Sequence, residues 1–418
     1  MSGQALRAAS FATTFLWLSA IQSLHSDEKP VWYSATSQHY VVESDVSEAF
    51  CVGVTEQMEQ LYGAYGRLLA LSPPENDHRF RIEIKADVNG YIERQQSEYH
   101  NRKFNNPKVI PTFVYHHYGM HSKRNVVCGF RCPDYALKEH LRHEGLHQYL
   151  RSIINDPPQW LNEGLAELVE GYQWDAEANA LRPFINRGFM RRVREGILDV
   201  DQGVLNEKYH YVPIRQIIAA SKADWLKTQE ISYAESWAIC YFLAHGPHDA
   251  YRPLLPSAIK VLQPNATRQQ NTALILDRVF QDMDWDLFEE RLLAYYRELK
   301  PPGFESLVQG QALMAQKKFA EAEAEFAKAL SADPDHAPAF YFCGSARYAQ
   351  SKFPEAEQDL LGAVERFPEY SSALFVLGKV HVYTRNREQA GKYLRLAKRY
   401  GTPARHVDPW LKRIENPN

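Results

Sequence analysis

The alternation of polar and apolar positions predicts a mixed α and β region over residues 31–130. Residues 79–85 alternate strictly, which is typical of a half-buried strand. Further strands are predicted over residues 40–43, 112–117 and 125–130. Apolar residues at helical spacing predict a long amphipathic helix over residues 46–71.

A second pattern predicts two consecutive helices. Residues 135–154 have helical character after Asp134, a plausible N-cap, and the following Asn-Asp-Pro-Pro string breaks the helix because proline cannot continue it. A new helix is predicted from position 158 or 159 to Glu170, with Gly171 as its stop. Residues 172–298 are predicted to be mainly helical, and a Pro-Pro-Gly linker follows them.

The C-terminal third contains an internal repeat of 34 residues. Small residues recur at this spacing: Gly310, Gly344 and Gly378; Ala322, Ala356 and Ala390; Ala329, Ala363 and Ala397. This period and these small residues resemble tetratricopeptide repeats. The resemblance implies an all-α solenoid of three repeats over residues 304–403, with a capping helix or tail over 404–418 that contains Trp410.

Four residues of the two central helices suggest a metal site with its own general base. His143 and His147 are four positions apart, so both can face one ion from the same side of a helix. Glu144 lies beside that face, where it can take a proton from water. Glu163, in the second turn of the next helix, is the candidate for a third ligand of Zn²⁺. Glu167 is one turn further and can reach a ligand imidazole.

These residues resemble the gluzincin metallopeptidases. The strings His143-Glu144-Gly145-Leu146-His147 and Trp160-Leu161-Asn162-Glu163-Gly164 are similar to those of the zinc aminopeptidase clan and of compact peptidase MA-like domains, including secreted bacterial domains of unknown function. The resemblance implies an α+β zincin-like domain over residues 31–300. It also implies His143, His147 and Glu163 as zinc ligands, Glu144 as catalytic base and Glu167 as the carboxylate that supports a ligand histidine.

One departure limits this resemblance. The aminopeptidases carry a Gly-x-Met-x-Asn type loop that holds the free amine of the substrate, and the nearest string here, Gly119-Met120-His121, lacks its acidic and amide residues. The resemblance therefore supports the metal chemistry better than aminopeptidase specificity.

A tyrosine from the downstream helices stabilises the oxyanion in the resembling families. Tyr233 is the candidate for that role here, with Tyr209, His210 and Tyr211 as weaker rivals. An ordinary packing tyrosine is the alternative, because the chain has 24 tyrosines.

Composition and the N-terminus indicate where the protein works. The chain has 418 residues, 45% of them hydrophobic and 24% charged, and its net charge of −3 does not favour binding to nucleic acid. Arg7 precedes an apolar run over residues 8–21, which predicts a signal peptide or N-terminal anchor over 1–26. We therefore expect export to the periplasm, the extracellular space or the outer side of a membrane. Cys128 and Cys132 can pair or remain free thiols.

The function predicted from these features is zinc-dependent hydrolysis of peptide bonds. The repeats are expected to bind a protein partner or the substrate, although they can also serve only to support or oligomerise the catalytic domain. Two other functions remain open: an inactive peptidase-like domain that acts with the repeats as a scaffold, and a zinc hydrolase of a non-peptide substrate.

Overall fold

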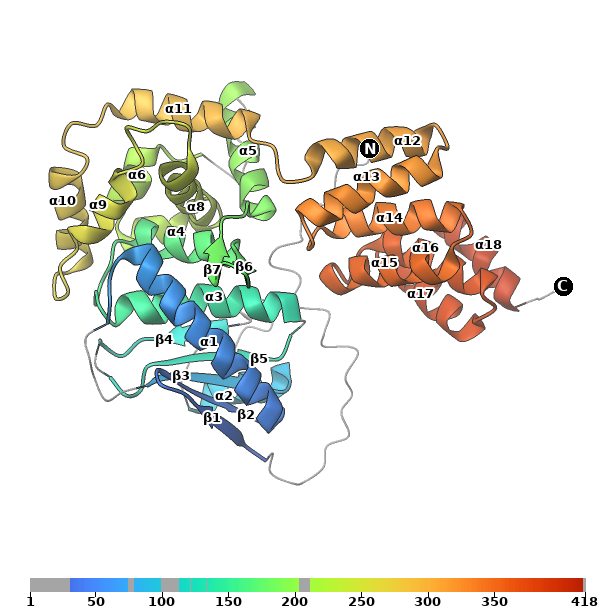
Figure 1. The fold of residues 1–418 in the computed structure, drawn as a ribbon, viewed down its shortest axis with the longest axis horizontal. Coiled ribbons are helices and arrows are strands. Elements are labelled where there is room, and N and C mark those ends of the chain that lie inside the picture. Colours follow the sequence, from blue (N-terminus) through green and yellow to red (C-terminus); the bar gives the residue numbers. More distant parts are fainter. Residues whose placement is uncertain are drawn as a thin grey trace. The chain divides into compact units, whose positions relative to one another are not determined.

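The chain divides into two compact units. The computed structural model describes residues 31–73, 79–98, 113–120, 122–132, 134–202 and 211–415 (Figure 1). One unit is Ser23–Leu299, and the other contains Lys300–Asn418. The predicted leader, residues 1–26, lies outside the described residues. Of the helices that are described, none has the length and apolar character needed to cross a bilayer.

A five-stranded mixed sheet forms one layer of the Ser23–Leu299 unit, in the order β1-β2-β3-β5-β4. Its strands are β1 (Tyr33–Thr36), β2 (Tyr40–Ser44), β3 (Phe80–Lys85), β4 (Phe113–His116) and β5 (Val126–Phe130). The pairs β2–β3 and β3–β5 are parallel, whereas β1 and β4 are antiparallel edge strands. Four of these strands are the predicted ones; β1 was missed because it is short and none of its residues is fully buried.

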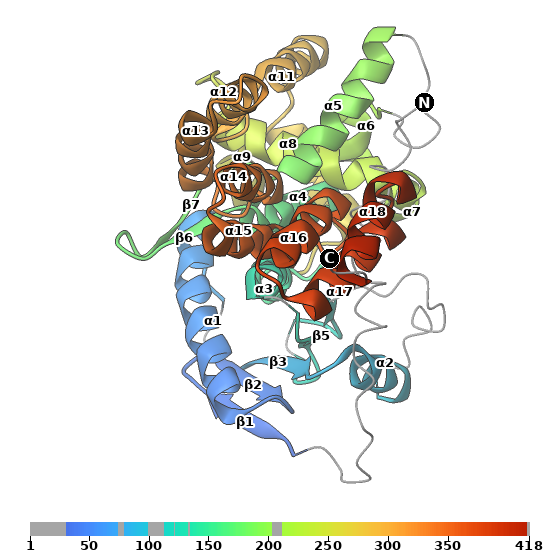
Figure 2. The same cartoon turned by 90° about the vertical axis from the view of Figure 1, so that its right-hand side faces the viewer.

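Helices cover both faces of this sheet (Figure 2). On one face, α1 (Glu48–Leu69) and α3 (Asp134–Arg151) share a core with Ile82, Ile84 and Val127. On the other, α2 (Val88–Ser97) packs against Val126, Cys128 and Phe130. Adjacent residues of β5 thus serve opposite cores, as the two-residue period of a strand requires. The helix α3 begins at Asp134, which is its first residue rather than its N-cap, and it ends three residues before the predicted end.

A helical layer completes this unit. Its centre is the packing of α4 (Gln159–Glu170) between α3 and α8 (Gln229–His245), and residues 159–169 of α4 are all buried. The bounds of α4 and its stop at Gly171 are as predicted. The other elements of this layer are α5 (Arg187–Gln202), α6 (Ile214–Ala219), α7 (Lys222–Lys227), α9 (Leu254–Lys260), α10 (Arg268–Arg278), α11 (Trp285–Glu298), and a small hairpin of β6 (Gln173–Asp175) and β7 (Ala180–Arg182).

The second unit is all helical and follows the 34-residue period. Its helices are α12 (Phe304–Ala315), α13 (Phe319–Ala332), α14 (Ala337–Ala349), α15 (Phe353–Arg366), α16 (Ser371–Tyr383), α17 (Arg387–Arg399) and α18 (Ala404–Glu415). A Cβ atom at Gly344 would lie 2.8 Å from Leu360, and one at Gly378 would lie 2.7 Å from Leu394. These glycines let the two helices of each repeat pack closely.

Two further features mark the ends of the repeats. Lys317, Ser351 and Arg385, again 34 residues apart, have positive φ angles and end the first helix of each pair. The predicted capping helix is α18, in which Val407 is buried and the Trp410 ring lies 6.0 Å from that of Tyr383.

Candidate metal centre

Close packing of four helices, α1, α3, α4 and α8, supports the candidate centre. Gly145 of α3 lies against α1, where an added Cβ would be 2.7 Å from Met58. Gly164 of α4 lies against α8, where a Cβ would be 2.4 Å from the backbone oxygen of Ser236. Gly145 directly follows Glu144 and Gly164 directly follows Glu163. Because glycine lacks a Cβ, α3 can pack closely on α1 and α4 can pack closely on α8 at the level of these site residues.

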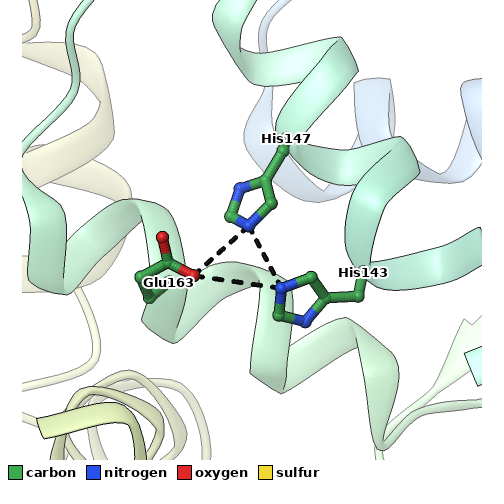
Figure 3. A group of neighbouring side chains, drawn as sticks. All are labelled: His143, His147 and Glu163. Atoms are coloured by element: carbon green, nitrogen blue, oxygen red, sulfur yellow. Dashed lines mark hydrogen bonds and ion pairs between the residues drawn. The ribbon is translucent and has the colours of Figure 1, made fainter. Parts of the chain in front are cut away.

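The structure brings His143, His147 and Glu163 together, as Figure 3 shows. The Nε2 atoms of the two histidines are 3.1 Å apart. Glu163 Oε2 lies 3.3 Å from His147 Nε2 and 3.9 Å from His143 Nε2. Three potential ligand atoms therefore converge on one point between α3 and α4.

These distances fit a zinc ion. With zinc bonds of about 2.0–2.1 Å, two ligand atoms of a tetrahedral site lie about 3.4 Å apart, close to the three separations found here. His147 and Glu163 are buried, with 7% and 8% of their surface exposed, and His143 is half-buried. Two imidazoles and one carboxylate leave a fourth position for water, which is the donor set of an open zinc site.

Glu163 is held in its ionised form. Burial opposes ionisation, but the charges of His147 and His143 and a hydrogen bond with His147 outweigh it and lower the pKa of Glu163 to about 2. Its other oxygen, Oε1, accepts hydrogen bonds from Gln159 Nε2 at 2.9 Å and Asn162 Nδ2 at 3.3 Å. These amides leave Oε2 directed at the histidines.

The carboxylate that supports His143 differs from the predicted one. The sequence predicted Glu167, but Glu170 Oε2 lies 2.8 Å from His143 Nδ1, and Glu167 Oε2 is 3.9 Å from the same nitrogen. Burial and the charge of Glu170 raise the pKa of Glu167, whereas the hydrogen bond with His143 lowers the pKa of Glu170 against the effect of burial. Glu170 was missed, although its position seven residues after Glu163 places both on one face of α4.

Glu144 is a residue of α3, and its carboxylate faces the edge strand β4 of the sheet. Its Oε2 accepts a hydrogen bond of 2.9 Å from the backbone N–H of Tyr115, in β4. That N–H is therefore directed away from the ladder with β5. The strand immediately before α3 is β5, which lies inside the sheet, and the edge strand beside it is β4. The order of the strands in the sheet decides which strand is the edge, and the alternation of apolar residues along a strand does not encode that order.

The charges of the centre act on Tyr233, a residue of α8. Burial, and then the charges of Glu163, Glu167 and Glu144, raise the pKa of its hydroxyl. For the rival Tyr211, burial and the charges of Glu235 and Glu289 raise the pKa, so that hydroxyl belongs to a different environment. Tyr209 and His210 lie outside the described residues.

Other polar residues near the motif do not join the three ligand candidates. The His140 ring stacks on Phe113 at 5.5 Å, and burial lowers its pKa. Cys128 and Cys132 are both free, as are the other three cysteines. Cys128 and Cys132 are therefore separate thiols and do not form a disulfide.

Comparisons with known proteins identify the C-terminal region. A family model for the tetratricopeptide repeat matches residues 307–369 and 343–404. The region is an array of tetratricopeptide repeats. A second model, described as a protein of unknown function (DUF1570), matches residues 139–260, a stretch that includes the three ligand candidates and Tyr233. A comparison with curated proteins found no match.

Several solved structures are similar to 27% of the chain. They include the first repeat domain of Spaghetti (RPAP3) bound to an HSP90 peptide, with 23% identity, 90% of that chain covered and a TM-score of 0.27. The Sgt2 repeat domain from Aspergillus fumigatus has 20% identity, 76% coverage and a TM-score of 0.26. The TPR2B domain of yeast Sti1 in complex with an Hsp70 peptide has 18% identity, 95% coverage and a TM-score of 0.27.

Proposed function

We propose that the Ser23–Leu299 unit is a zinc-dependent peptidase of the gluzincin type. The observation that carries this proposal is the convergence of His143 Nε2, His147 Nε2 and Glu163 Oε2 at separations that suit one zinc ion. When bound there, zinc would act as a Lewis acid on the scissile carbonyl and lower the pKa of a water molecule. The two imidazoles and the carboxylate are the donor set expected for that chemistry, and Glu144 is the expected general base.

The residues of the chain supply the proton transfers. Glu144 removes a proton from the attacking water and later returns it to the leaving amine. The hydrogen bond from the Tyr115 N–H holds the carboxylate of Glu144 beside β4, and the charge of Glu144 acts on His143. The Tyr233 hydroxyl, which the same carboxylates influence, donates a hydrogen bond to the oxyanion that develops on the substrate carbonyl.

The edge strand β4 supports a peptide as the substrate. Its antiparallel neighbour β5 occupies one side. On the other side the Tyr115 N–H already donates to Glu144, so a peptide would pair with the remaining backbone groups of that side. An extended peptide can add to such an edge as a further strand, which would lay its backbone beside the base.

We also propose that the repeats bind a protein partner or the substrate. Repeat arrays present extended surfaces made by successive helices. Large apolar side chains are exposed on this unit, including Val308 (47%), Tyr383 (45%) and Leu361 (39%). Such side chains are suited to contact with another polypeptide.

We further propose, from the apolar N-terminal run, that the protein is exported or anchored outside the cytoplasm. Fractionation of cells that produce the full chain tests it, and recovery of unprocessed chain only in the cytoplasm would contradict it.

Metal analysis and peptide cleavage test the catalytic proposal together. We expect the purified chain to bind one zinc ion and to cleave an unfolded protein or a peptide library. Glu144→Ala should keep zinc and lose turnover, and His147→Ala should lose both. His406→Ala, an exposed histidine of α18, is the matched control and should keep both. A chain that takes up no divalent metal contradicts the proposal, and zinc without cleavage of any peptide favours a scaffold.

A further inference from the structure

A polar hollow lies at the C-terminal end of α3. Its volume is about 340 Å³, and its lining includes His117, Arg151, Asn155, Asp156 and Thr267. These residues come from the segment after β4, from α3, from the α3–α4 connection and from the start of α10. The hollow is not part of the three-residue centre described above.

Helical spacing places the hollow next to the centre. Arg151 follows His147 by four residues and His143 by eight, so all three lie along one face of α3. One turn of four residues advances about 6 Å along the axis, a distance that an extended peptide spans in about two residues. A peptide bound at the centre can therefore reach Arg151.

Tyr115 joins the two regions by hydrogen bonds. Its backbone N–H donates to Glu144, and its hydroxyl lies 3.2 Å from His117 Nδ1. His117 Nε2 in turn lies 3.1 Å from Asn155 Oδ1. Burial, and then the charge of Arg151, lowers the pKa of His117. A neutral imidazole that accepts from Tyr115 and donates to Asn155 satisfies both contacts.

The hollow contains the Arg151 guanidinium, which forms no ion pair with the described residues, although the charges of Asp156 and Glu163 act on it. The carboxylate of Asp156 is committed to Arg268, with Oδ1 2.6 Å from Nη2 and Oδ2 2.8 Å from the backbone N–H. Arg151 Nη2 donates to the backbone oxygen of Asn155 at 3.1 Å. Within the described parts of the chain, the Arg151 guanidinium forms no ion pair, and its Nε is buried without a hydrogen-bond partner. A cation held this way favours an anion from outside the chain.

We propose that this hollow is a subsite for a carboxylate of the peptide substrate, with Arg151 as its binding residue. The inference rests on the proposed peptidase function, because it places the carboxylate about two residues from the scissile bond. The carboxylate is either the C-terminus of the peptide or the side chain of an aspartate or glutamate. A planar guanidinium matches either one, and a neutral peptide lacks the group it pairs with.

Peptide binding to the full chain in the presence of a chelator tests the subsite without turnover. Three labelled peptides share one neutral sequence: one ends in an amide, one in a free carboxylate, and one in an amide with a single internal glutamate. We expect at least one carboxylate peptide to bind about tenfold more tightly than the amide, as one charge-assisted hydrogen bond provides. Comparison of the two carboxylate peptides identifies the source of the group.

Variants of Arg151 and of nearby residues test which side chain causes the preference for a carboxylate. Arg151→Gln should reduce it to less than about twofold, and Arg151→Lys should keep part of it. Lys138→Gln removes an exposed charge from the same helix and should leave the preference unchanged. Thr267→Asp retains an N-cap for α10 and adds a negative charge to the hollow, so it should weaken only the carboxylate peptides.

Three results would overturn the subsite: no binding of any peptide, equal binding of amide and carboxylate peptides, or a preference that survives both Arg151→Gln and Thr267→Asp. The chelator prevents turnover, so these results do not depend on catalysis. If the chain lacks peptidase activity but shows the expected preference, only the proposed function fails.

Discussion

His143 and Glu170 are joined by a hydrogen bond of 2.8 Å between Nδ1 and Oε2, which connects the third turn of α3 to the last residue of α4. In the metal-bound state, the proton on Nδ1 would be donated to the carboxylate, and Nε2, directed at His147 and Glu163, would be the ligand atom. This contact fixes both the tautomer and the orientation of the ring. It makes Glu170 the positioning residue of the proposed metal centre.

Glu170→Ala should therefore lower zinc affinity by about 10- to 100-fold, the usual effect of removing a carboxylate that supports a ligand histidine. Competition with a chromophoric chelator measures this affinity. Glu167→Gln is the matched comparison, because Glu167 Oε2 lies 3.9 Å from the same nitrogen, and it should have the smaller effect. The reverse order would return the supporting role to Glu167.

Tyr233→Phe should lower kcat by about 100-fold if the hydroxyl stabilises the oxyanion, because removal of one such donor has about that effect. KM and zinc affinity should change little, since the aromatic ring keeps its contact with Trp225, at 4.5 Å between centroids. Steady-state kinetics on a peptide substrate provide the measurement. Tyr211→Phe, whose hydroxyl is influenced by Glu235 and Glu289 instead, is the control. Equal effects of the two variants would remove Tyr233 from the mechanism.

Gly164→Ala should destabilise the Ser23–Leu299 unit, by about 1–3 kcal/mol, and weaken metal binding. The added methyl group would meet the Ser236 backbone oxygen at 2.4 Å and Cys240 Sγ at 2.7 Å, so α4 must move away from α8. Denaturant unfolding followed by tryptophan fluorescence measures the loss. Gly53→Ala is the matched control: it is exposed in α1, nothing lies within 4 Å of its added Cβ, and it should stabilise by about 0.5–1 kcal/mol. If Gly164→Ala were as stable as Gly53→Ala, the close packing of α4 on α8 would be wrong.

Glu235→Gln should stabilise the chain at neutral and alkaline pH. Burial raises the pKa of Glu235 well above its ordinary value of 4.5, so the folded state keeps a proton that the unfolded state has lost. Folding stability from this group is fully present below pH 4.5 and is lost as pH rises toward the folded-state pKa, by about 1.4 kcal/mol for each pH unit in that window. The glutamine stays neutral and keeps an oxygen for the Val212 N–H.

Urea unfolding of the two proteins across pH measures this difference. The stability of Glu235→Gln should equal that of the unchanged chain below pH 4.5 and exceed it increasingly above. Glu298→Gln, which makes the same substitution at an exposed position of α11, is the control. A difference that does not vary with pH would mean that Glu235 is ionised in the folded state.

The sequence by itself determined the features that depend on local spacing. The interval of four between His143 and His147, the proline break before α4 and the 34-residue period all act within one element or between adjacent helices, and the structure has each of them. Local periodicity sets which side chains share a face, and this needs no knowledge of distant contacts.

Only the tertiary structure decided which side chains meet across elements. The choice of Glu170 over Glu167 depends on how deeply α4 packs against α3, and both carboxylates have suitable sequence positions. The place of β4 at the sheet edge and the contact between Tyr115 and Glu144 depend on strand order, which alternation does not encode. Arg151 shares a helical face with the histidines in sequence, but only the folding of α10 against the α3–α4 connection gives Asp156 to Arg268 and leaves Arg151 without an ion pair among the described residues.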